Sequence, residues 1–356
     1  MSGKSERRGP ARLFTILVGA ALVVGACSSS ASPTPPPASQ AAASQAAASG
    51  KPLASRCGGT NTFEIGFAQS NFAEPYRAAT DAQMTKLFQS VPQFHLTITD
   101  GTGDAGVQAT QIQAFQTKGV DLLLSSPQDT VPGTPPITAV YNAGIPVILL
   151  DRTISTDAYT AFIGGDNVAI GKMAGEYVAT KLLPNGGDVA IVEGDQATQP
   201  ALDRQNGFKA GVAGNPNIKV VAEQTANWRK ADAQTVTNAI LTAHPTIKFI
   251  YFANDEMESG GAIAINALGL KGKVLTGGTD GLVSPPGDNG MEQVASGEQA
   301  FTIIYPTNAP EAFAMAKDIL LNCATSEPKT TNPATTLVDS SNVAQVTAQL
   351  KAEAGQ

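Results

Sequence analysis

The sequence predicts an α/β fold made of two doubly wound parallel sheets, that is, two Rossmann-like lobes. Short apolar runs recur along the chain, as expected for parallel strands that are buried on both faces. Segments with apolar residues at helical spacing separate these runs, which indicates right-handed βαβ units. Eight or more such units suit two sheets better than one, and the chain of 356 residues is long enough for two domains.

The predicted strands are the apolar runs themselves. They cover Thr62–Ala68, Phe94–Thr99, Val120–Ser125, Ile145–Leu150, Asp188–Glu193, Ile218–Glu223, Ile247–Phe252 and Val274–Gly277. The intervening helices each have one apolar face. Two of these faces are formed by Ile170, Met173, Ala174, Tyr177 and Val178, and by Val236, Ala239, Ile240 and Ala243.

The N-terminal residues predict export. Basic residues at positions 4, 7, 8 and 12 precede an uncharged apolar run over 13–26, which is the pattern of a signal peptide. This run is shorter than the roughly 20 residues that a membrane-spanning helix needs. Val24-Gly25-Ala26-Cys27 resembles the lipobox of bacterial lipoproteins, so we expect a signal peptide over 1–26 and lipidation of Cys27. The alternative is an ordinary signal peptide with a nearby cysteine.

Residues 27–56 are almost entirely Ser, Ala, Pro, Gln and Gly, which predicts a disordered tether before a domain that starts near Cys57. Cleavage after residue 26 would reduce the basic residues from 23 to 19 and the acidic residues from 30 to 29, a net charge of −10. An acidic domain without a basic cluster argues against nucleic acid as a partner.

Two further cysteines would lie in an oxidising compartment, where disulfides persist. Cys57 immediately precedes the first predicted strand, and Cys323 follows a helical pattern formed by Phe313, Ala316, Ile319 and Leu320. A crossover helix ends at the sheet edge where strands begin, so we expect a Cys57–Cys323 disulfide. Two free buried thiols are the alternative.

The usual signatures of catalysis and cofactor binding are absent from the sequence. His95 lies within a strand pattern and His244 beside a proline at a helix end, and neither has another metal ligand at suitable spacing. The sequence has no G-x-S-x-G, P-loop, G-x-G-x-x-G after a strand or Cys-x-x-Cys. We therefore expect no catalytic residue, no metal and no cofactor, and a protein that binds its ligand without converting it.

Polar and aromatic residues instead follow six of the predicted strands. Ligands of open α/β sheets bind outside the carboxyl ends of the strands, so these positions are candidates for a binding site. They are residues 69–77, Asp151-Arg152, Asp203-Arg204, Asn227-Trp228-Arg229, Asn254-Asp255 and Asp280-Gly281. Charged and amide groups suit sugar hydroxyls, and aromatic rings suit the C–H faces of a sugar.

Across residues 60–345 the chain resembles the type I periplasmic sugar-binding proteins, the ribose- and galactose-binding kind. The resemblance lies in IGFAQSNFAEPYR (65–77), GIPVILLDR (144–152), IGGDNVAIG (163–171), ALDRQNGF (201–208), FANDEMESGGAIAI (252–265) and GGTDG (277–281), in the family's order and spacing. The resemblance implies two lobes joined by three crossing strands near residues 164, 305 and 336. The N-terminal lobe would be 57–163 plus 306–335, and the C-terminal lobe 164–305 plus 336–356.

The resemblance also implies a set of ligand-binding residues. Asp151 and Arg152 match the family's Asp-Arg pair, Arg204 its arginine before Gly-Phe, and Asn254 and Asp280 its further polar ligands. Trp228 and Tyr76 match the aromatic residues that stack on the two faces of a sugar. Three positions depart from the ribose-binding pattern, namely Glu74 for an asparagine, Arg77 for an aromatic residue and Tyr305 for a glutamine. The pair at 76–77 is similar to the galactofuranose-binding branch.

Several of these residues have a structural alternative. Asn254 and Asp280 suit helix caps or turns, Trp228 suits core packing, and Arg77 suits the solvated face of a helix. Asp166 and Asn167, which also resemble the family, are interpreted as capping residues.

The resemblance implies a monomer that captures a small neutral sugar or polyol by lobe closure and delivers it to the permease of an ABC importer. The lipidated Cys27 would anchor it to the outer face of the cytoplasmic membrane. Three other functions are weighed: a receptor that presents a sugar or signal molecule to a membrane sensor, a cytoplasmic transcription regulator, which the lipobox excludes, and a glycosidase-like enzyme with Glu74, Asp151 and Asp280 as carboxylates.

Overall fold

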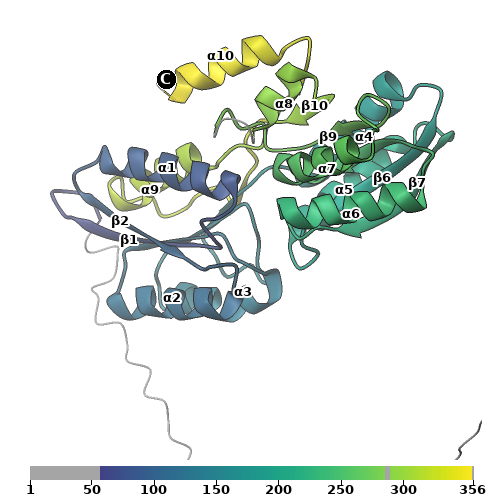
Figure 1. Ribbon diagram of the computed structural model, residues 1–356. Coiled ribbons are helices and arrows are strands. Elements are labelled where there is room, and N and C mark those ends of the chain that lie inside the picture. Colours follow the sequence, from purple (N-terminus) through teal and green to yellow (C-terminus); the bar gives the residue numbers. More distant parts are fainter. Residues whose placement is uncertain (1–56, 285–288, 355–356) are drawn as a thin grey trace, which may run out of the picture. The chain divides into compact units, whose positions relative to one another are not determined.

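The computed structural model describes residues 57–284 and 289–354. The predicted signal peptide, the lipidation site Cys27 and the predicted tether lie outside these residues. Within them, the strands form two six-stranded sheets with helices on both faces of each, which confirms the predicted two-lobe α/β fold (Figure 1). No helix in this part of the chain is long and apolar enough to cross a membrane.

The first sheet is entirely parallel and has the strand order β11-β5-β4-β3-β1-β2. Its strands are β1 (Phe63–Gln69), β2 (Phe94–Asp100), β3 (Leu122–Ser125), β4 (Val147–Leu150), β5 (Ala161–Ile163) and β11 (Thr330–Thr331). The central strands β3 and β4 are buried at every position, so their side chains need an apolar layer on both faces.

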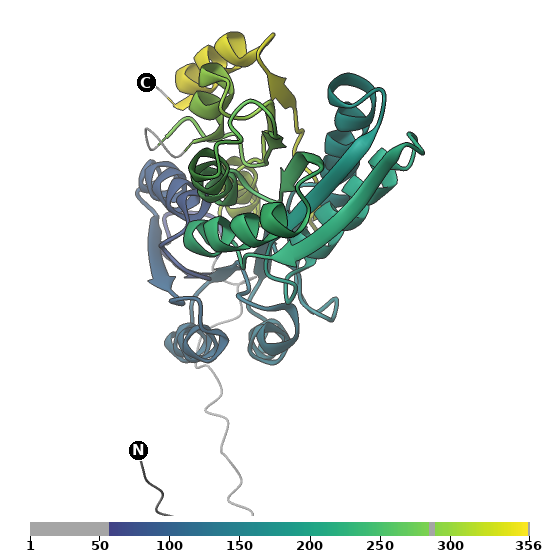
Figure 2. The ribbon, with the colours of Figure 1, turned by 45° about the vertical axis from the view of Figure 1, so that its right-hand side comes forward.

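Helices on each face of this sheet supply those layers. Helices α1 (Pro75–Gln89) and α9 (Ala309–Leu320) pack on one face, and α2 (Ala105–Lys118) and α3 (Thr130–Asn142) pack on the other. Figure 2 shows α2 and α3 nearly end-on beneath the sheet. The first sheet and these four helices are called the first lobe.

The second sheet has the order β12-β10-β9-β8-β6-β7 and is parallel except for β12, which runs antiparallel to β10. Its strands are β6 (Gly187–Glu193), β7 (Ile218–Thr225), β8 (Ile247–Phe252), β9 (Leu275–Gly277), β10 (Phe301–Ile303) and β12 (Leu337–Asp339).

Helices α6 (Lys230–Ala243) and α7 (Asp255–Ala267) cover one face of the second sheet. Helices α4 (Asn167–Tyr177) and α5 (Gln199–Val212) cover the other, and α4 continues into a π-helical turn, η2 (Val178–Leu182). Helices α8 (Gly290–Ser296) and α10 (Val343–Ala354) pack together beside β12. The second sheet and these helices are called the second lobe.

The chain crosses between the two sheets three times: after β5, after β10 and between β11 and β12. These crossings lie where the family resemblance implies them, near residues 164, 305 and 336. The exact lobe boundaries implied by the resemblance stay a prediction.

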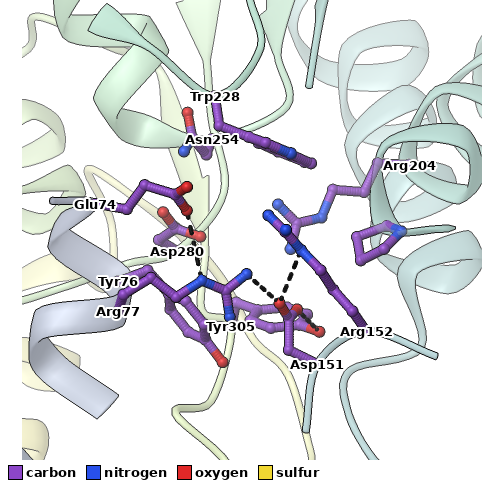
Figure 3. Close-up of a pocket in the computed structure, with 11 residues that line it drawn as sticks. Glu74, Tyr76, Arg77, Asp151, Arg152, Arg204, Trp228, Asn254, Asp280 and Tyr305 are labelled. Atoms are coloured by element: carbon purple, nitrogen blue, oxygen red, sulfur yellow. Dashed lines mark hydrogen bonds and ion pairs between the residues drawn. The ribbon is translucent and has the colours of Figure 1, made fainter. Parts of the chain in front are cut away.

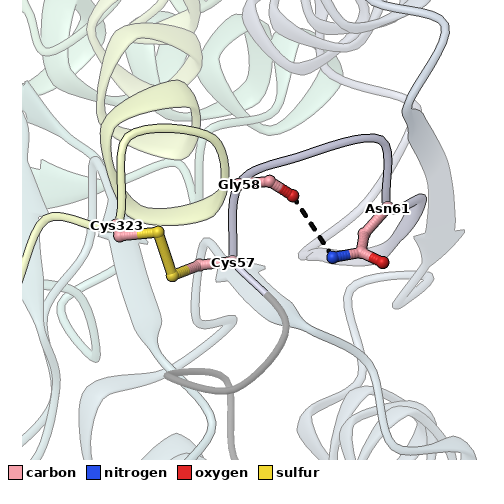
Figure 4. The surroundings of a disulfide bond; sticks show 4 residues. All are labelled: Cys57, Gly58, Asn61 and Cys323. Carbon is pink, nitrogen blue, oxygen red and sulfur yellow. Dashed lines mark hydrogen bonds between the residues drawn. A yellow bond between two sulfur atoms is a disulfide. The ribbon is translucent and has the colours of Figure 1, made fainter.

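Cys57 and Cys323 form a disulfide with a Cα–Cα distance of 5.3 Å, as the sequence predicts (Figure 4). Beside it, the Gly58 amide donates to the Leu320 carbonyl at the end of α9 (2.8 Å). The disulfide therefore attaches the residues before β1 to the C-terminal end of α9, within the first lobe.

Candidate functional site

One pocket with about 300 Å³ of empty space lies at the carboxyl ends of the strands of both sheets (Figure 3). Its lining contains all ten predicted ligand-binding residues, namely Glu74, Tyr76, Arg77, Asp151, Arg152, Arg204, Trp228, Asn254, Asp280 and Tyr305, and also Pro200. The structure thus brings every predicted residue to one place; that they bind a ligand stays a prediction.

The loop after β1 and the first turn of α1 supply three of these residues. Pro75 begins the helix, as proline suits the first helical position, and the backbone of Glu74 serves as its N-cap. The Glu74 side chain accepts a hydrogen bond from Asn71 Nδ2 (2.6 Å), and its Oε2 lies 3.5 Å from Arg77 Nε. Arg77 is only 3% exposed, so the alternative of a solvated helix-face residue is wrong.

Asp151 follows β4 directly, with a left-handed backbone (φ 65°). Its Oδ2 accepts from Arg77 Nη2 at 2.6 Å, and its Oδ1 accepts from the Tyr305 hydroxyl at 2.8 Å. Burial alone would raise the pKa of Asp151, but the charges of Arg77 and Arg152 outweigh it and hold the pKa below its usual value. Asp151 is therefore an ionised carboxylate in the pocket wall.

Arg152 is 2% exposed and extends along the same wall. Its Nη1 donates to the Gln128 carbonyl (2.7 Å), while its Nε has no hydrogen-bond partner within the described residues and lies 3.7 Å from Asp151 Oδ2. Burial and the neighbouring Arg77 lower the pKa of Arg152. A buried guanidinium with an unpartnered N–H is a donor that an acceptor on a ligand would satisfy.

Arg204 projects into the pocket from the second lobe, on α5. Its Nε donates to Asn167 Oδ1 (2.8 Å) and its Nη1 to the Ala253 carbonyl (2.6 Å). The guanidinium carbon lies 4.6 Å from the centre of the Tyr305 ring. Burial would lower the pKa of Arg204, but the charge of Asp280 outweighs it and raises the pKa.

The two aromatic positions that resemble stacking residues lie on opposite sides of the pocket (Figure 3). Trp228 is 7% exposed and packs against Gly194, where a Cβ would lie 2.2 Å from the indole ring, so a larger residue would displace it. Trp228 also belongs to the apolar core of the second lobe. It therefore has the structural role weighed above, core packing, and lines the pocket as well. Tyr76 donates its hydroxyl hydrogen to the Pro306 carbonyl (2.9 Å).

Asn254 and Asp280 follow β8 and β9. The Asn254 side chain accepts from the Met257 amide (2.9 Å), so its alternative role as the N-cap of α7 is observed, and the residue lines the pocket as well. Asp280 is 7% exposed, and burial raises its pKa well above the usual value although Arg204 opposes this. A carboxyl group held neutral can donate a hydrogen bond as well as accept one.

Three supporting residues were not predicted. Pro200 lines the pocket, Ser126 accepts from Arg77 Nη1 (2.9 Å), and Asn167 holds Arg204 instead of capping α4. The capping role falls to Asp166 alone, which accepts from the Ala169 amide (2.9 Å). Of these three residues, only Asn167 had a signal in the sequence that could have pointed to the site, namely its place in the family segment IGGDNVAIG.

The pocket therefore combines three arginines, three carboxyl groups, an amide and three aromatic rings. Such a lining suits a small molecule with closely spaced donors and acceptors and an apolar face. Within the described residues, no group of three or more His, Cys, Asp or Glu side chains is arranged to hold a metal ion.

A family model described as a periplasmic binding protein domain matches residues 65–321. The D-allose-binding periplasmic protein of Escherichia coli (strain K12) is 34% identical over 187 residues, which cover 51% of this chain and 60% of that protein, less than two thirds of its length. The fructose import binding protein FruE of Bifidobacterium longum is 31% identical over 268 residues, covering 72% of this chain and 79% of that protein.

Among solved structures, the fructose binding periplasmic domain of the hybrid two-component system BT1754 matches with a TM-score of 0.78 and 32% identity. The match covers 82% of this chain and 96% of that domain. The family match spans more than half of the chain, and the fold and the position of the pocket agree with it. The chain belongs to the periplasmic binding protein family, among its type I sugar-binding members.

Proposed function

We propose that this protein is an extracytoplasmic solute-binding lipoprotein that captures a monosaccharide or related polyol and delivers it to an ABC sugar importer. One observation carries the proposal: a single pocket is lined from both lobes by alternating arginines and carboxyl groups, with aromatic rings on opposite sides. The pocket already contains carboxyl groups that face its arginines, so it does not require a charged ligand, and we propose a neutral one. The names of the relatives, which bind allose and fructose, favour a sugar.

Capture would work by lobe closure. The lobes are in contact in this structure, since the Thr130 amide of the first lobe donates to the Ala197 carbonyl of the second (3.3 Å). A ligand that binds groups of both lobes stabilises the closed arrangement over an open one. The closed lobes then form the surface that the importer recognises.

The predicted signal peptide and Cys27 would export the protein and anchor it to the outer face of the cytoplasmic membrane. The segment between Cys27 and Cys57 would act as the tether, keeping the binding domain close to the permease. We propose that the protein acts as a monomer, without a metal or cofactor and without catalysing a reaction.

The test is a titration of the exported protein with fructose, allose, ribose, galactose and myo-inositol, followed by the fluorescence of Trp228 and by thermal unfolding. Trp228 is the only tryptophan in the chain, so its emission reports on this pocket. We expect one sugar class to change the emission and to stabilise the fold, by about 2.7 kcal/mol at 100 times its Kd. A protein that responds to none of these polyhydroxy compounds would contradict the proposed ligand class.

The variant Asp151→Asn tests whether the sugar binds in this pocket. It removes the negative charge that faces Arg77 and should weaken sugar binding by about 30-fold or more, since breaking a buried charge pair costs about 2–5 kcal/mol. The control is Asp203→Asn, the same charge change at the half-buried residue before Arg204, which does not line the pocket and should leave affinity unchanged.

A second candidate function is a receptor that presents its sugar to a membrane sensor. The similarity to the periplasmic domain of a hybrid two-component system favours it. Uptake of a labelled sugar, measured in cells with and without this protein, separates the two functions. Uptake that depends on the protein supports transport, whereas unchanged uptake with altered sugar-dependent transcription supports the receptor.

A further inference from the structure

The turn after β9 carries Asp280 into the pocket in a backbone conformation that few residues adopt. Asp280 has a φ of 132°, and Gly281 after it has a φ of 63°. A non-glycine residue persists in such a conformation only where its surroundings hold it there, and such residues are frequent at ligand sites. The Asp280 carboxyl group has no hydrogen bond to the residues that the structure describes, so its position depends on how firmly this turn is held.

A buried acid outside the pocket holds the turn. Asp255 is the first residue of α7, is 3% exposed and does not line the pocket. Its Oδ2 accepts from the Gly281 amide (2.8 Å), and its own backbone amide donates to the Thr279 carbonyl (2.8 Å). Asp255 therefore binds the residue on each side of Asp280.

The Asp255 carboxylate is in turn fixed by its neighbours. The Thr302 hydroxyl, on β10, lies 2.9 Å from Oδ1 and 2.7 Å from Oδ2, and Gln299 Nε2 donates to Oδ1 (3.2 Å). Backbone lies close on two further sides, because a Cβ on Gly278 or Gly290 would be 2.2 Å or 2.0 Å from a carboxylate oxygen. A side chain packed this tightly has one available position, and so does the amide that it binds.

We propose that Asp255 is a positioning residue for ligand binding: its hydrogen bond to the Gly281 amide fixes the turn that directs the Asp280 carboxyl group into the pocket. The role rests on the proposed function, in which Asp280 contacts the sugar (Figure 3). The bonds between Asp255 and the turn all lie within the second lobe, so they can also be tested without a ligand.

The first experiment measures hydrogen exchange of the Gly281 amide by NMR in the sugar-free protein, relative to the amides of the central strand β6. Asp255→Ala removes the acceptor and should speed this exchange by about tenfold or more. Asp255→Asn should keep most of the protection, because its amide oxygen can accept from Gly281 while its NH₂ group faces the Thr302 hydroxyl.

Asp104→Ala is the matched control. Asp104 is the N-cap of α2, where its carboxylate also accepts two backbone amides, but it lies in the first lobe and does not line the pocket. This variant should leave both Gly281 exchange and sugar affinity unchanged. Asp255→Ser repeats the test with less disturbance of α7, since serine suits the start of a helix but its hydroxyl ends one bond short of the Gly281 amide.

The second experiment measures sugar affinity through Trp228 with and without the Asp280 carboxyl group. Asp255→Ala alone should weaken binding by about tenfold, but by less than about threefold in an Asp280→Ala background, where the group that it positions is gone. In an Asp151→Asn background, which alters a carboxylate of the first lobe, the full effect should remain. General damage to the fold would instead give the same loss in both backgrounds.

The proposal is overturned if Gly281 exchange in folded Asp255→Ala and Asp255→Ser matches that of the wild type. It is also overturned if the loss of affinity is equal with and without the Asp280 carboxyl group. A protein that binds no sugar but shows faster Gly281 exchange in Asp255→Ala would contradict the proposed function and still support the hold of Asp255 on the turn.

Discussion

Asp151 connects the charged groups of the first lobe with the crossing after β10. Its two oxygens accept from Arg77 and from the hydroxyl of Tyr305, which itself accepts from the Gly165 amide (3.2 Å). A buried ion pair of this kind contributes little net stability unless all its hydrogen-bonding groups are satisfied. Its main effect here is to fix the position of the carboxylate before a ligand arrives, which lowers the entropic cost of binding.

Tyr305→Phe tests this arrangement. The variant leaves the buried amide of Gly165 without its partner and frees one oxygen of Asp151, so we expect a loss of about 1–3 kcal/mol in the free energy of unfolding. Sugar affinity should fall as well, because Asp151 is then less well positioned. Urea unfolding and Trp228 titration measure the two effects. Tyr159→Phe is the control, a half-buried tyrosine outside the pocket; equal losses in both variants would refute the explanation.

At the scale of residues, strand ends and family motifs were sufficient to predict which side chains gather in the pocket. They did not predict what holds those side chains in place. The Asn167–Arg204 bond joins positions 37 residues apart, and the Arg77–Ser126 bond joins positions 49 apart. Contacts between distant segments depend on the packed structure, and no local pattern in the sequence reports them.

Helices α4 and α5 approach each other closely, and this approach sets the position of Arg204. Gly207 lies on α5 at the contact, where a Cβ would be 2.2 Å from the Val168 carbonyl oxygen of α4. Backbone atoms cannot yield as a flexible side chain can, so any larger residue must push the helices apart. Arg204 lies one turn before Gly207 and would move with α5.

Gly207→Ala should therefore destabilise the protein by about 1–3 kcal/mol, the usual cost of overpacking. It should also weaken sugar binding through displacement of Arg204. The control is Gly214→Ala, beyond the end of α5, where the nearest atom to a Cβ is 3.7 Å away. Urea unfolding and sugar titration of both variants provide the comparison, and a stable Gly207→Ala protein with normal affinity would contradict the role of this contact.

The eight predicted strands all occur, with bounds that differ by at most two residues at either end. Strands β5, β10, β11 and β12 were not predicted as strands, although the crossings near them were. Each is only two or three residues long, too short for an apolar run or an alternating pattern to be recognised. Their pairing depends on neighbouring strands rather than on local sequence.

The stability of the whole molecule should depend on pH through its buried carboxyl groups. Burial raises the pKa of Glu258 to about 8 in the folded state, whereas the same carboxyl group in the unfolded chain loses its proton near its ordinary pKa of 4.5. Between these values the folded state binds more protons, so the free energy of unfolding should fall as pH rises, by up to about 1.4 kcal/mol per pH unit. Burial raises the pKa values of Asp255 and Asp280 in the same direction.

The variant Glu258→Gln should remove the part of this pH dependence of the free energy of unfolding that comes from Glu258. Urea unfolding at pH 5, 6, 7 and 8 should give a flatter curve for the variant than for the wild type. Parallel curves would mean that Glu258 does not stay protonated in the folded state.

The disulfide closes a loop between positions 266 residues apart, which includes both sheets apart from β11 and β12. Such a crosslink restricts the unfolded chain, and the loop-entropy relation gives a stabilisation of about 5.6 kcal/mol. The double variant Cys57→Ser/Cys323→Ser should lose much of this stability in urea unfolding and still bind sugar, since neither cysteine lines the pocket. A loss below about 1 kcal/mol would contradict the estimate.

The same disulfide determines which parts of the protein bear a pulling force applied to the chain before Cys57. Tension on the chain before Cys57 divides between the backbone that leads into β1 and the sulfur bridge to the end of α9. Both paths end in the core of the first lobe, where β1 and α9 pack together. The three crossings carry none of this tension. If Cys27 anchors the protein to a membrane as proposed, movement of the anchor would therefore not separate the two lobes.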